Sequence, residues 1–379
     1  MSETIFILMH KDIPVLRVLM SDRRTILKVL EIINREHLPV NMQGDEHIVA
    51  SLYKFMTSRT IPNSRKNLPY ILEMYDTVDA VSLSMFTYQV SMSDHYWFKP
   101  ENANLTWANV NFYDNIFVDN LLFLGSLDSK GINFSSPNTS LNGSLPQMWS
   151  KRNGYNVLLK GGTVFNQQPF NEVFVSRLLD ATDIPHVQYD LVYDNAAGWV
   201  SACNAFTNES IEFVPAWMIG DSGNPKANRY EVFVQRAESM GIKEARAFIN
   251  AMLAIDYLTV NDDRHYGNFG FLRNSDTLQY IGMAPIFDNG NTFGYLDGRI
   301  KPHMPSYAYK SQPFSTTHDK QIKYIRTLLP TIDIDRLAHI GHHILEDVYN
   351  KNDMLSPERI TAIGELLDTR MRQLKRVLE

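Results

Sequence analysis

Four polar residues have the types and the spacing that phosphoryl transfer requires. Asp263 and Asn268 lie on one polar segment, Asp288 follows later in the chain, and Lys160 ends an apolar run upstream. Transfer of a phosphoryl group needs metal ions and a cation on the phosphates, and a carboxylate that orients the attacking hydroxyl. An aspartate for the hydroxyl, asparagine and aspartate oxygens for magnesium, and a lysine for the phosphates make up such a set.

The elements around the polar segment explain how its side chains can meet. Apolar residues at helical spacing predict a helix over residues 243–259, directly before Asp263. Two short apolar runs, 269–272 and 278–283, flank a polar turn and predict a hairpin. Because the hairpin returns the chain to Asp288, we expect the three oxygen-bearing side chains to converge on one metal–phosphate cluster.

Upstream of this region the patterns predict a small sheet-containing lobe that could hold a nucleotide. The expected elements are strands at 155–160, 186–193 and 198–203 and a helix at 171–179. The segment 121–149 before them is rich in Ser, Asn, Gly and Pro, which is typical of a linker or a functional loop.

The two ends of the chain carry further patterns. The N-terminal part predicts two strands and then two helices, at 5–9, 15–20, 23–34 and 46–57. Ser356-Pro357 is a strong start signal for a C-terminal helix, since serine caps the first turn and proline fits its first position.

The composition is that of a folded protein without a broad nucleic-acid footprint. The chain has 379 residues, enough for two or three folding units, with 44% hydrophobic and 21% charged residues. A net charge of -6 argues against a general basic surface for DNA or RNA. The single cysteine, Cys203, excludes a disulfide framework, and no run approaches the about 20 apolar residues of a membrane helix. We therefore expect a cytoplasmic protein.

The motifs bring a family resemblance. Asn261-x-Asp263-x-His265-x-x-Asn268 with the later Ala284-Pro285-Ile286-Phe287-Asp288-Asn289-Gly290 resembles the catalytic loop and metal-binding segment of HipA-like serine/threonine kinases. Its core is also similar to that of phosphoinositide kinases. Three further segments resemble motifs of this family. Asn171-Glu172 resembles a helix-borne Asn-Glu pair, and Leu158-Leu159-Lys160 resembles a strand with a phosphate-binding lysine. Ser140-Leu141-Asn142-Gly143 resembles a phosphate loop.

This resemblance implies a role for each matching residue. Asp263 would be the catalytic residue that orients or deprotonates the acceptor hydroxyl, and Asn268 and Asp288 would be the Mg²⁺ ligands. The expected contacts to ATP are Lys160 on the phosphates, Glu172 fixing that lysine or the metal, the loop residues Ser140, Gly143 and Ser144 over the nucleotide, and a hinge from Ala202 to Asn204 around adenine.

The resemblance also implies a fold, an acceptor and a partner. It predicts an α+β, bilobal protein-kinase-like fold with an N-terminal accessory domain (1–120), a nucleotide-binding lobe (121–206) and a mostly helical catalytic lobe (207–379). ATP would bind in the cleft between the lobes, and the acceptor would be a protein serine or threonine. HipA-like proteins are often toxins paired with a DNA-binding antitoxin, which implies such a partner. No membrane association and no direct contact with nucleic acid are expected.

Several alternatives stay open from the sequence. A lipid or small-molecule kinase would share the catalytic loop, a pseudokinase would bind ATP without transfer, and a related enzyme could transfer AMP. Leu145-Pro146-Gln147 stands where the family often has a basic residue, so autophosphorylation of Ser140 is left open. Asp262 is interpreted as a solvated neighbour of the catalytic residue, His265 as an orienting group, and His339, His342 and His343 as a solvated or packed helical face. The acceptor, the oligomeric state and the role of residues 1–120 do not follow from the sequence.

Overall fold

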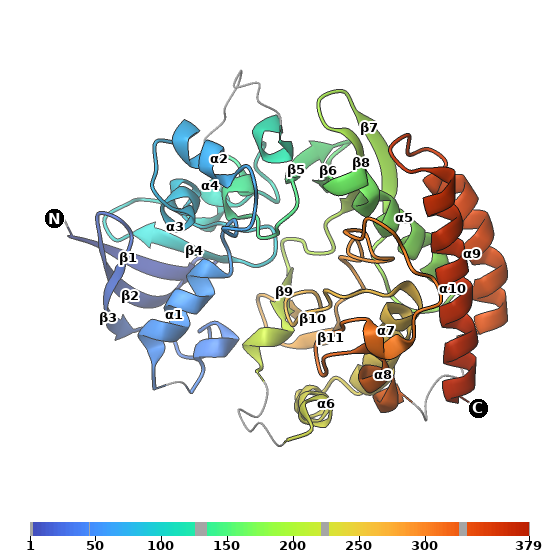
Figure 1. The fold of residues 1–379 in the computed structure, drawn as a ribbon. Helices are drawn as coiled ribbons and strands as arrows, with labels where there is room; N and C mark the ends of the chain where they lie inside the picture. The colour runs from blue at the N-terminus through green and yellow to red at the C-terminus, as the bar shows by residue number, and fades with distance from the viewer. Residues whose placement is uncertain (1–2, 45, 126–134, 221–226, 326–331, 379) are drawn as a thin grey trace. The chain divides into compact units, whose positions relative to one another are not determined.

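The computed structural model describes residues 3–44, 46–125, 135–220, 227–325 and 332–378 (Figure 1). The chain forms a mixed α+β protein, as predicted, with antiparallel sheets and ten α-helices among these residues. Contacts divide it into two compact units. Unit 1 comprises 1–160, 205–214 and 273–279, and unit 2 comprises 161–204, 215–272 and 280–379. The predicted three-domain division stays a prediction.

A four-stranded antiparallel sheet begins unit 1, in the order β3-β2-β1-β4 (Figure 1). Its strands are β1 (Glu3–His10), β2 (Ile13–Ser21), β3 (Ile26–Ile32) and β4 (Tyr96–Pro100). Between β3 and β4 the chain forms the helices α1 (Ile48–Thr57), α2 (Leu68–Met74) and α3 (Ala80–Ser84), and α4 (Trp107–Val110) follows β4. The two predicted strands and the helix expected at 46–57 are confirmed.

The helix predicted over 23–34 is wrong, because this segment forms strand β3. Short apolar runs fit the helical and the extended period about equally well, and tertiary pairing then decides between them. Here β2 supplies the backbone partners of β3, with register shifts along the pair. The bulges explain why apolar side chains in this edge strand do not alternate strictly between its two faces.

The remaining part of unit 1 leads to the predicted nucleotide elements. A hydrophobic cluster that includes Trp97, Trp107 and Trp149 shares residues with the hairpin of β5 (Gln147–Arg152) and β6 (Tyr155–Lys160). Strand β6 confirms the strand predicted at 155–160. Of the predicted polar segment 121–149, residues 126–134 lie outside the described part of the chain.

Unit 2 is built on helices, and its central helix is buried on nearly every side. It contains the hairpin of β7 (Asp190–Asp194) and β8 (Gly198–Asn204), strand β11 (Tyr280–Met283), and the helices α5 (Gln167–Leu179), α6 (Arg229–Ser239), α7 (Ala245–Thr259), α8 (His318–Gln321), α9 (Ile334–Tyr349) and α10 (Pro357–Leu378). In α5 every residue except Arg177 is buried, including several polar ones. Buried polar side chains need hydrogen-bond partners, so this helix is expected to bind other segments.

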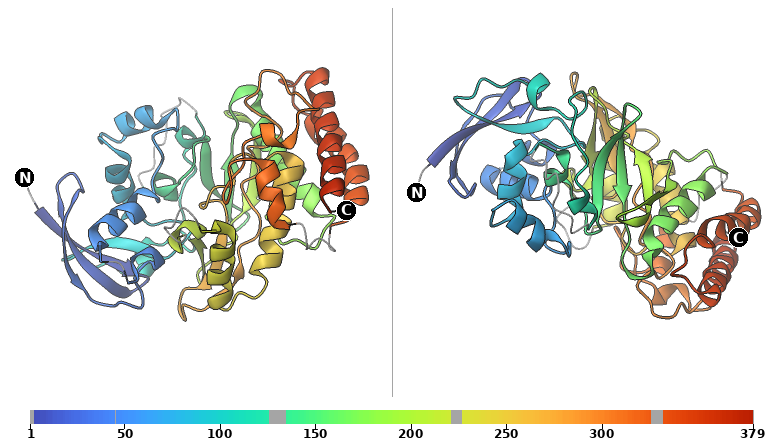
Figure 2. Two further views of the ribbon diagram at one scale, coloured as in Figure 1. Left: turned by 60° about the horizontal axis from the view of Figure 1, so that its bottom comes forward. Right: turned by 90° about the horizontal axis from the view of Figure 1, so that it is seen from above.

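The last two helices close unit 2. Helices α9 and α10 lie side by side in all views (Figure 2), and His342 on α9 lies 2.8 Å from the Asp368 carboxylate on α10. The backbone N–H of Arg359 donates to Ser356 Oγ, which confirms the predicted serine cap of α10.

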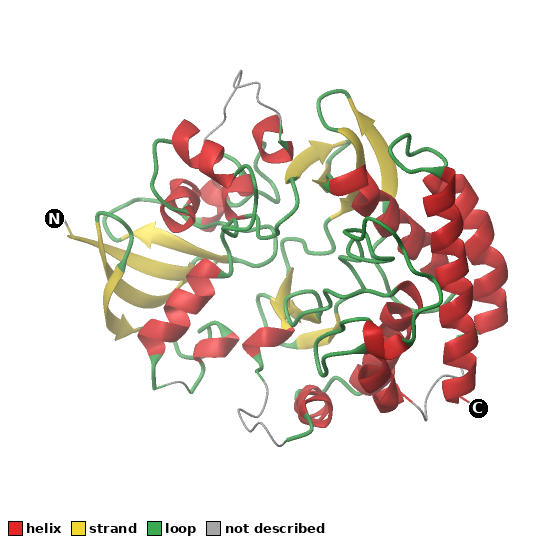
Figure 3. Cartoon of the chain, viewed as in Figure 1, coloured by secondary structure: helices red, strands yellow, loops and turns green. Residues whose placement is uncertain are grey.

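The predicted hairpin before Asp288 is also confirmed. Strand β10 (Gly270–Asn274) pairs with β11, and β9 (Ile211–Pro215) is the third strand of this sheet. The N–H of Ala284 donates to the Gly270 carbonyl at 2.9 Å and fixes where the chain leaves β11. From there to residue 325 the chain is mostly loop (Figure 3).

Candidate active site

The polar segment 261–268 begins where α7 ends. Val260, directly after the helix, has a left-handed backbone with a φ of 55°. A β-branched residue rarely adopts this conformation, so the surroundings must hold it. The Asn261 N–H donates to the Asp256 carbonyl and its Nδ2 to the Asp256 carboxylate, both at 2.9 Å. The last turn of α7 therefore sets the direction of the segment.

Arg264 ties the polar segment to the segment that carries Asp288. Its side chain is fully buried, and its Nε and Nη2 atoms donate to the Asp256 carboxylate at 3.0 and 2.9 Å. Its Nη1 donates to the carbonyls of Asn268, at 3.0 Å, and Phe287, and Nη2 also donates to Asn289 Oδ1. A guanidinium can satisfy this many acceptors in one plane. The two predicted motif segments are therefore held together by one cation.

Asp263 lies in an electrostatic environment that disfavours its charge. Burial raises the pKa of the Asp263 carboxyl, and the nearby Asp288 carboxylate raises it further. His265 and the hydrogen bond from Asn291 act in the opposite direction on this pKa. The Asn291 Nδ2 donates to Asp263 Oδ2 at 2.8 Å, and no hydrogen bond to Oδ1 occurs among the described residues. One carboxylate oxygen is thus fixed by the protein while the other remains available.

Asn268 and Asp288 have the donor atoms that a magnesium site needs. The Nδ2 of Asn268 donates to the Asp263 carbonyl at 3.0 Å, which leaves its Oδ1 as the atom that can bind a cation. Asp288 has a left-handed backbone with a φ of 58° and places its charge close enough to act on the pKa of Asp263. Amide and carboxylate oxygens are hard ligands that suit Mg²⁺, and a cation would relieve the repulsion between the two carboxylates.

The predicted Asn-Glu pair on α5 holds the segment after Asp288. Glu172 Oε2 accepts the Asn289 backbone N–H at 2.7 Å. The Nδ2 of Asn171 donates to the carbonyls of Gly290 and Thr292, at 2.7 and 3.0 Å. Both side chains are buried. The pair therefore fixes the backbone that carries the proposed metal ligand Asp288.

Asp262 and His265, the competitors for the catalytic role, have other environments. Asp262 as a whole residue is exposed, but partial desolvation of its carboxyl and then the Asp263 charge raise the pKa of that carboxyl to about 6. His265 Nδ1 accepts the Gly267 N–H at 3.0 Å, which stabilises the turn after Asp263. Because one ring nitrogen of His265 is engaged in this hydrogen bond, the geometry favours the predicted role, in which His265 orients the loop.

Four predicted nucleotide contacts belong to unit 1. Lys160 is buried at the end of β6, and Ser140 is buried at the end of a 3₁₀ turn, while Gly143 and Ser144 follow in a loop. Gly143 has a φ of 136°, and a Cβ added there would lie 2.0 Å from the Gln147 side chain. Only glycine fits this position. The predicted roles of these residues toward ATP remain predictions.

The loop has a support that we did not predict from the sequence. Buried Arg65 donates from Nε to the Gly143 carbonyl at 2.8 Å and from Nη2 to the Leu141 carbonyl at 2.9 Å. Burial lowers the pKa of Arg65 to about 9, which still leaves it charged at neutral pH. Nothing in the local sequence around Arg65 signals this contact.

The predicted hinge lies in unit 2. Ala202, Cys203 and Asn204 form the last three residues of β8, and Cys203 is buried. Its predicted contact with adenine remains a prediction.

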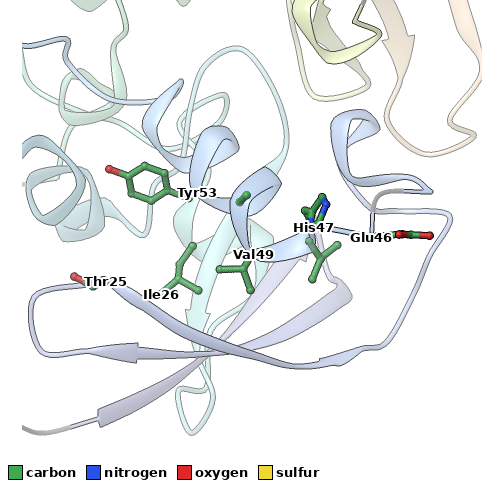
Figure 4. A pocket seen from close by; sticks show the side chains of 8 residues that line it. Thr25, Ile26, Glu46, His47, Val49 and Tyr53 are labelled. Atoms are coloured by element: carbon green, nitrogen blue, oxygen red, sulfur yellow. The ribbon is translucent and has the colours of Figure 1, made fainter. Parts of the chain in front are cut away.

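One surface cavity of about 560 Å³ lies elsewhere, in unit 1 between β3 and α1 (Figure 4). It is lined by Thr25, Ile26, Glu46, His47, Ile48, Val49, Ala50 and Tyr53. None of these residues is a lysine or an arginine, so the cavity lacks the cations that a nucleotide phosphate would need.

Comparison with solved structures identifies the fold. HipA from the toxin–antitoxin system of Shewanella oneidensis MR-1, solved with HipB and its operator DNA, aligns over 98% of this chain and 97% of its own, with a TM-score of 0.56 at 12% identity. This chain has the HipA fold.

A weaker likeness involves a kinase. The proinflammatory kinase CtkA from Helicobacter pylori covers 61% of this chain and 92% of its own, with a TM-score of 0.46 at 20% identity. No family model matches the sequence, and neither does any curated protein. Within the described part of the HipA fold seen here, no helix has the length and apolarity to cross a membrane.

Proposed function

We propose that the chain is an ATP- and Mg²⁺-dependent kinase that transfers the γ-phosphoryl group to a protein serine or threonine hydroxyl. The observation that carries the proposal is the Arg264 network, which holds the segment of Asp263 and Asn268 against the segment of Asp288. The HipA fold supports it as a fold-level analogy.

Each residue of the network has a defined task in this reaction. Asp263 orients the acceptor hydroxyl and can accept its proton through Oδ1, since Asn291 occupies Oδ2. Asn268 Oδ1 and the Asp288 carboxylate would bind Mg²⁺. The bound ion would neutralise part of the negative charge on the phosphates. Glu172 and Asn171 keep the backbone after Asp288 in place.

For the nucleotide we propose the residues predicted from the sequence. Lys160 would pair with the phosphates, and backbone N–H groups of 140–144 would donate hydrogen bonds to them. Several donors together are needed to hold the phosphates in position. The Arg65 contacts to the carbonyls of this loop support its preorganisation, because they fix its backbone before the ligand arrives.

The HipA structure also motivates a proposal about partners. HipA was solved with HipB and operator DNA. We propose that this chain likewise has a protein partner of the antitoxin type, and copurification from its own cell, followed by a test of DNA binding by the complex, would examine this.

The first test of the proposed function removes one carboxylate charge at a time. We expect Asp263→Asn to lower transfer of labelled γ-phosphate about 10²–10⁴-fold, the range typical of a lost general base. Asp288→Asn should also lose activity and should depend more steeply on Mg²⁺ concentration. Both variants should keep the wild-type unfolding midpoint, since neither side chain belongs to the apolar core.

Asp353→Asn is the matched control, because Asp353 is exposed and lies outside the site; it should retain full transfer. Undiminished activity of Asp263→Asn would overturn the assignment. Offering protein, inositide and sugar acceptors in parallel separates the kinase classes, and the mass of the product distinguishes phosphate from AMP.

A further inference from the structure

A second polar cluster lies in unit 1, away from the residues discussed so far. His10 is the last residue of β1, His95 directly precedes β4, and Glu212 lies in β9. These side chains are buried, with exposed fractions of 1%, 0% and 1%. Within the described ranges of the chain, this is the one group of three potential ligand side chains whose donor atoms lie within 4.8 Å of one another.

The distances between the donor atoms match the edges of a small coordination polyhedron. His10 Nε2 lies 3.2 Å from Glu212 Oε2, and His95 Nδ1 lies 3.5 Å from the same oxygen. Ligands about 2.0–2.2 Å from a tetrahedral Zn²⁺ are about 3.3–3.6 Å apart. Two of the three edges therefore have the length that a shared ion would impose.

The tautomer of His95 leaves a lone pair directed at this position. Its Nε2 lies 2.9 Å from the Asn208 carbonyl, which can only accept, so Nε2 carries the proton. In the neutral ring Nδ1 is then unprotonated, and it makes no hydrogen bond to any described residue. A fully buried acceptor without a donor is costly, whereas a metal-bound histidine commonly has this arrangement with a carbonyl behind it.

The other two donors also have partners behind them. Arg273 donates to Glu212 Oε1 from Nε at 2.7 Å and from Nη2 at 2.6 Å. The other oxygen, Oε2, accepts the His95 backbone N–H at 3.4 Å and faces the two imidazoles, so it is the oxygen placed to bind an ion. His10 Nδ1 lies 2.8 Å from His37 Nδ1. If His10 donates this proton, its Nε2 presents a lone pair toward Glu212.

We propose that His10 Nε2, His95 Nδ1 and Glu212 Oε2 bind one Zn²⁺-like divalent transition metal ion, with a water molecule at a fourth position. Two imidazoles and a carboxylate are a donor set that suits zinc and its neighbours in the periodic table. The ion would join β1, the start of β4 and β9, three strands of unit 1. This inference is independent of the proposed kinase activity.

The alternative is a hydrogen-bonded cluster without metal. In that case a proton on His10 Nε2 bridges to Glu212 Oε2, and the Arg273–Glu212 ion pair balances the buried charge. Metal binding displaces that proton, so affinity should fall at acid pH. The positive charge of Arg273 also opposes a cation, which predicts a site weaker than one without this arginine.

The test uses the full chain, freed of metal with a chelator and then titrated. We expect one equivalent of Zn²⁺ to remain after gel filtration, a rise in Tm on adding it, and the visible absorption of tetrahedral Co²⁺ when cobalt replaces zinc. His95→Gln should lose the retained ion, while His342→Gln should keep it, because His342 is exposed on α9 and lies in unit 2.

Three results would overturn the proposal. The wild type could retain less than a tenth of an equivalent of Zn²⁺, with no Co²⁺ absorption and no change in Tm, which is the result expected of the hydrogen-bonded cluster. His95→Gln could bind as tightly as wild type, or His342→Gln could lose the ion. Should His95→Gln fail to fold, the Co²⁺ spectrum and the Tm of the wild type decide the question alone.

Discussion

At the scale of single residues, Asp263 illustrates how the protein controls one charge. Burial and Asp288 raise the pKa of its carboxyl, and the Asn291 hydrogen bond lowers it. The proposed reaction needs the ionised form, so transfer should fall as the pH drops through this pKa. The side chain of Asn291 therefore affects the pH range in which the proposed reaction proceeds.

We predict that Asn291→Ala moves the acid limb of the kcat/KM profile to higher pH. A hydrogen bond to a charged group contributes about 1.5–3 kcal/mol, and about 1.4 kcal/mol corresponds to one pKa unit, so the limb should move by roughly one to two units. The variant should be most impaired on the acid side and recover toward pH 8. Steady-state transfer rates between pH 5 and 9 measure this.

Asn350→Ala is the matched control, since Asn350 is exposed at the end of α9; its profile should equal that of the wild type. A uniform loss of activity at every pH in Asn291→Ala would contradict the electrostatic role and leave only a structural one.

The residue scale also shows what spacing in the sequence can reveal. Asp263, Asn268 and Asp288 stand in a recognisable pattern, and all three lie in unit 2, tied together by Arg264. Asn291 and Asp256 escaped prediction because their contacts join segments whose path is set by tertiary folding. A single asparagine or aspartate carries no local signal that distinguishes such a partner from a surface residue.

At the scale of elements, α5 acts as a clamp on two other parts of unit 2. Asn171 donates to two carbonyls of the segment after Asp288 and accepts from the Tyr349 hydroxyl of α9 at 2.7 Å. Glu172, one residue on, accepts from the Asn289 backbone. A buried helix with polar residues at these positions holds its neighbours by hydrogen bonds as well as by packing.

We predict that Asn171→Ala lowers the free energy of unfolding by about 2–4 kcal/mol. The substitution leaves two carbonyls and one hydroxyl buried without their partner, and an unsatisfied buried group costs about 1–3 kcal/mol. Urea denaturation followed by tryptophan fluorescence measures the change. It should exceed any change in Asn350→Ala by at least threefold, and equal stabilities of the two variants would show that α5 does not act as a clamp.

Some helices and strands could be predicted from their local sequence, and others could not. Helix α7 and the β10–β11 hairpin were predicted because each has a length and a pattern that fit one structure. Strand β3 was predicted as a helix because Ile26, Leu27, Leu30 and Ile33 also fit helical spacing, and only the pairing with β2 decides. Helix α5 begins at Gln167, four residues before the predicted start at residue 171. Its first turn contains buried polar side chains, and a polar stretch is typical of a loop when only the sequence is considered.

At the scale of the whole molecule, neither unit is one continuous stretch of chain. The chain changes unit five times, at 160/161, 204/205, 214/215, 272/273 and 279/280. Composition and periodicity along the sequence cannot reveal such interleaving, because the short segments 205–214 and 273–279 have no core of their own. Within unit 1 they contribute Glu212 and Arg273, which are buried against His10, His95 and Tyr96.

We predict from this that residues 1–160 alone do not fold into a stable domain. Their buried polar groups at His10, His95 and Tyr96 would lose the carboxylate and the guanidinium that satisfy them. Breaking a buried ionic network by removing partners costs about 3–5 kcal/mol, a large share of the stability of a domain this size. Thermal unfolding followed by circular dichroism should show no cooperative transition for this fragment.

A polypeptide that joins 1–160 to 205–214 and 273–279 through flexible linkers provides the matching control, since it restores Glu212 and Arg273 and little else. Cooperative unfolding of this polypeptide but not of 1–160 would show that two short distant segments complete the N-terminal unit. Replacing Glu212 by glutamine in the joined chain should then weaken the transition, because a neutral acceptor cannot pair with the buried Arg273. Cooperative unfolding of 1–160 at the same temperature would instead mean that this unit is continuous in sequence and that the later segments only cover it.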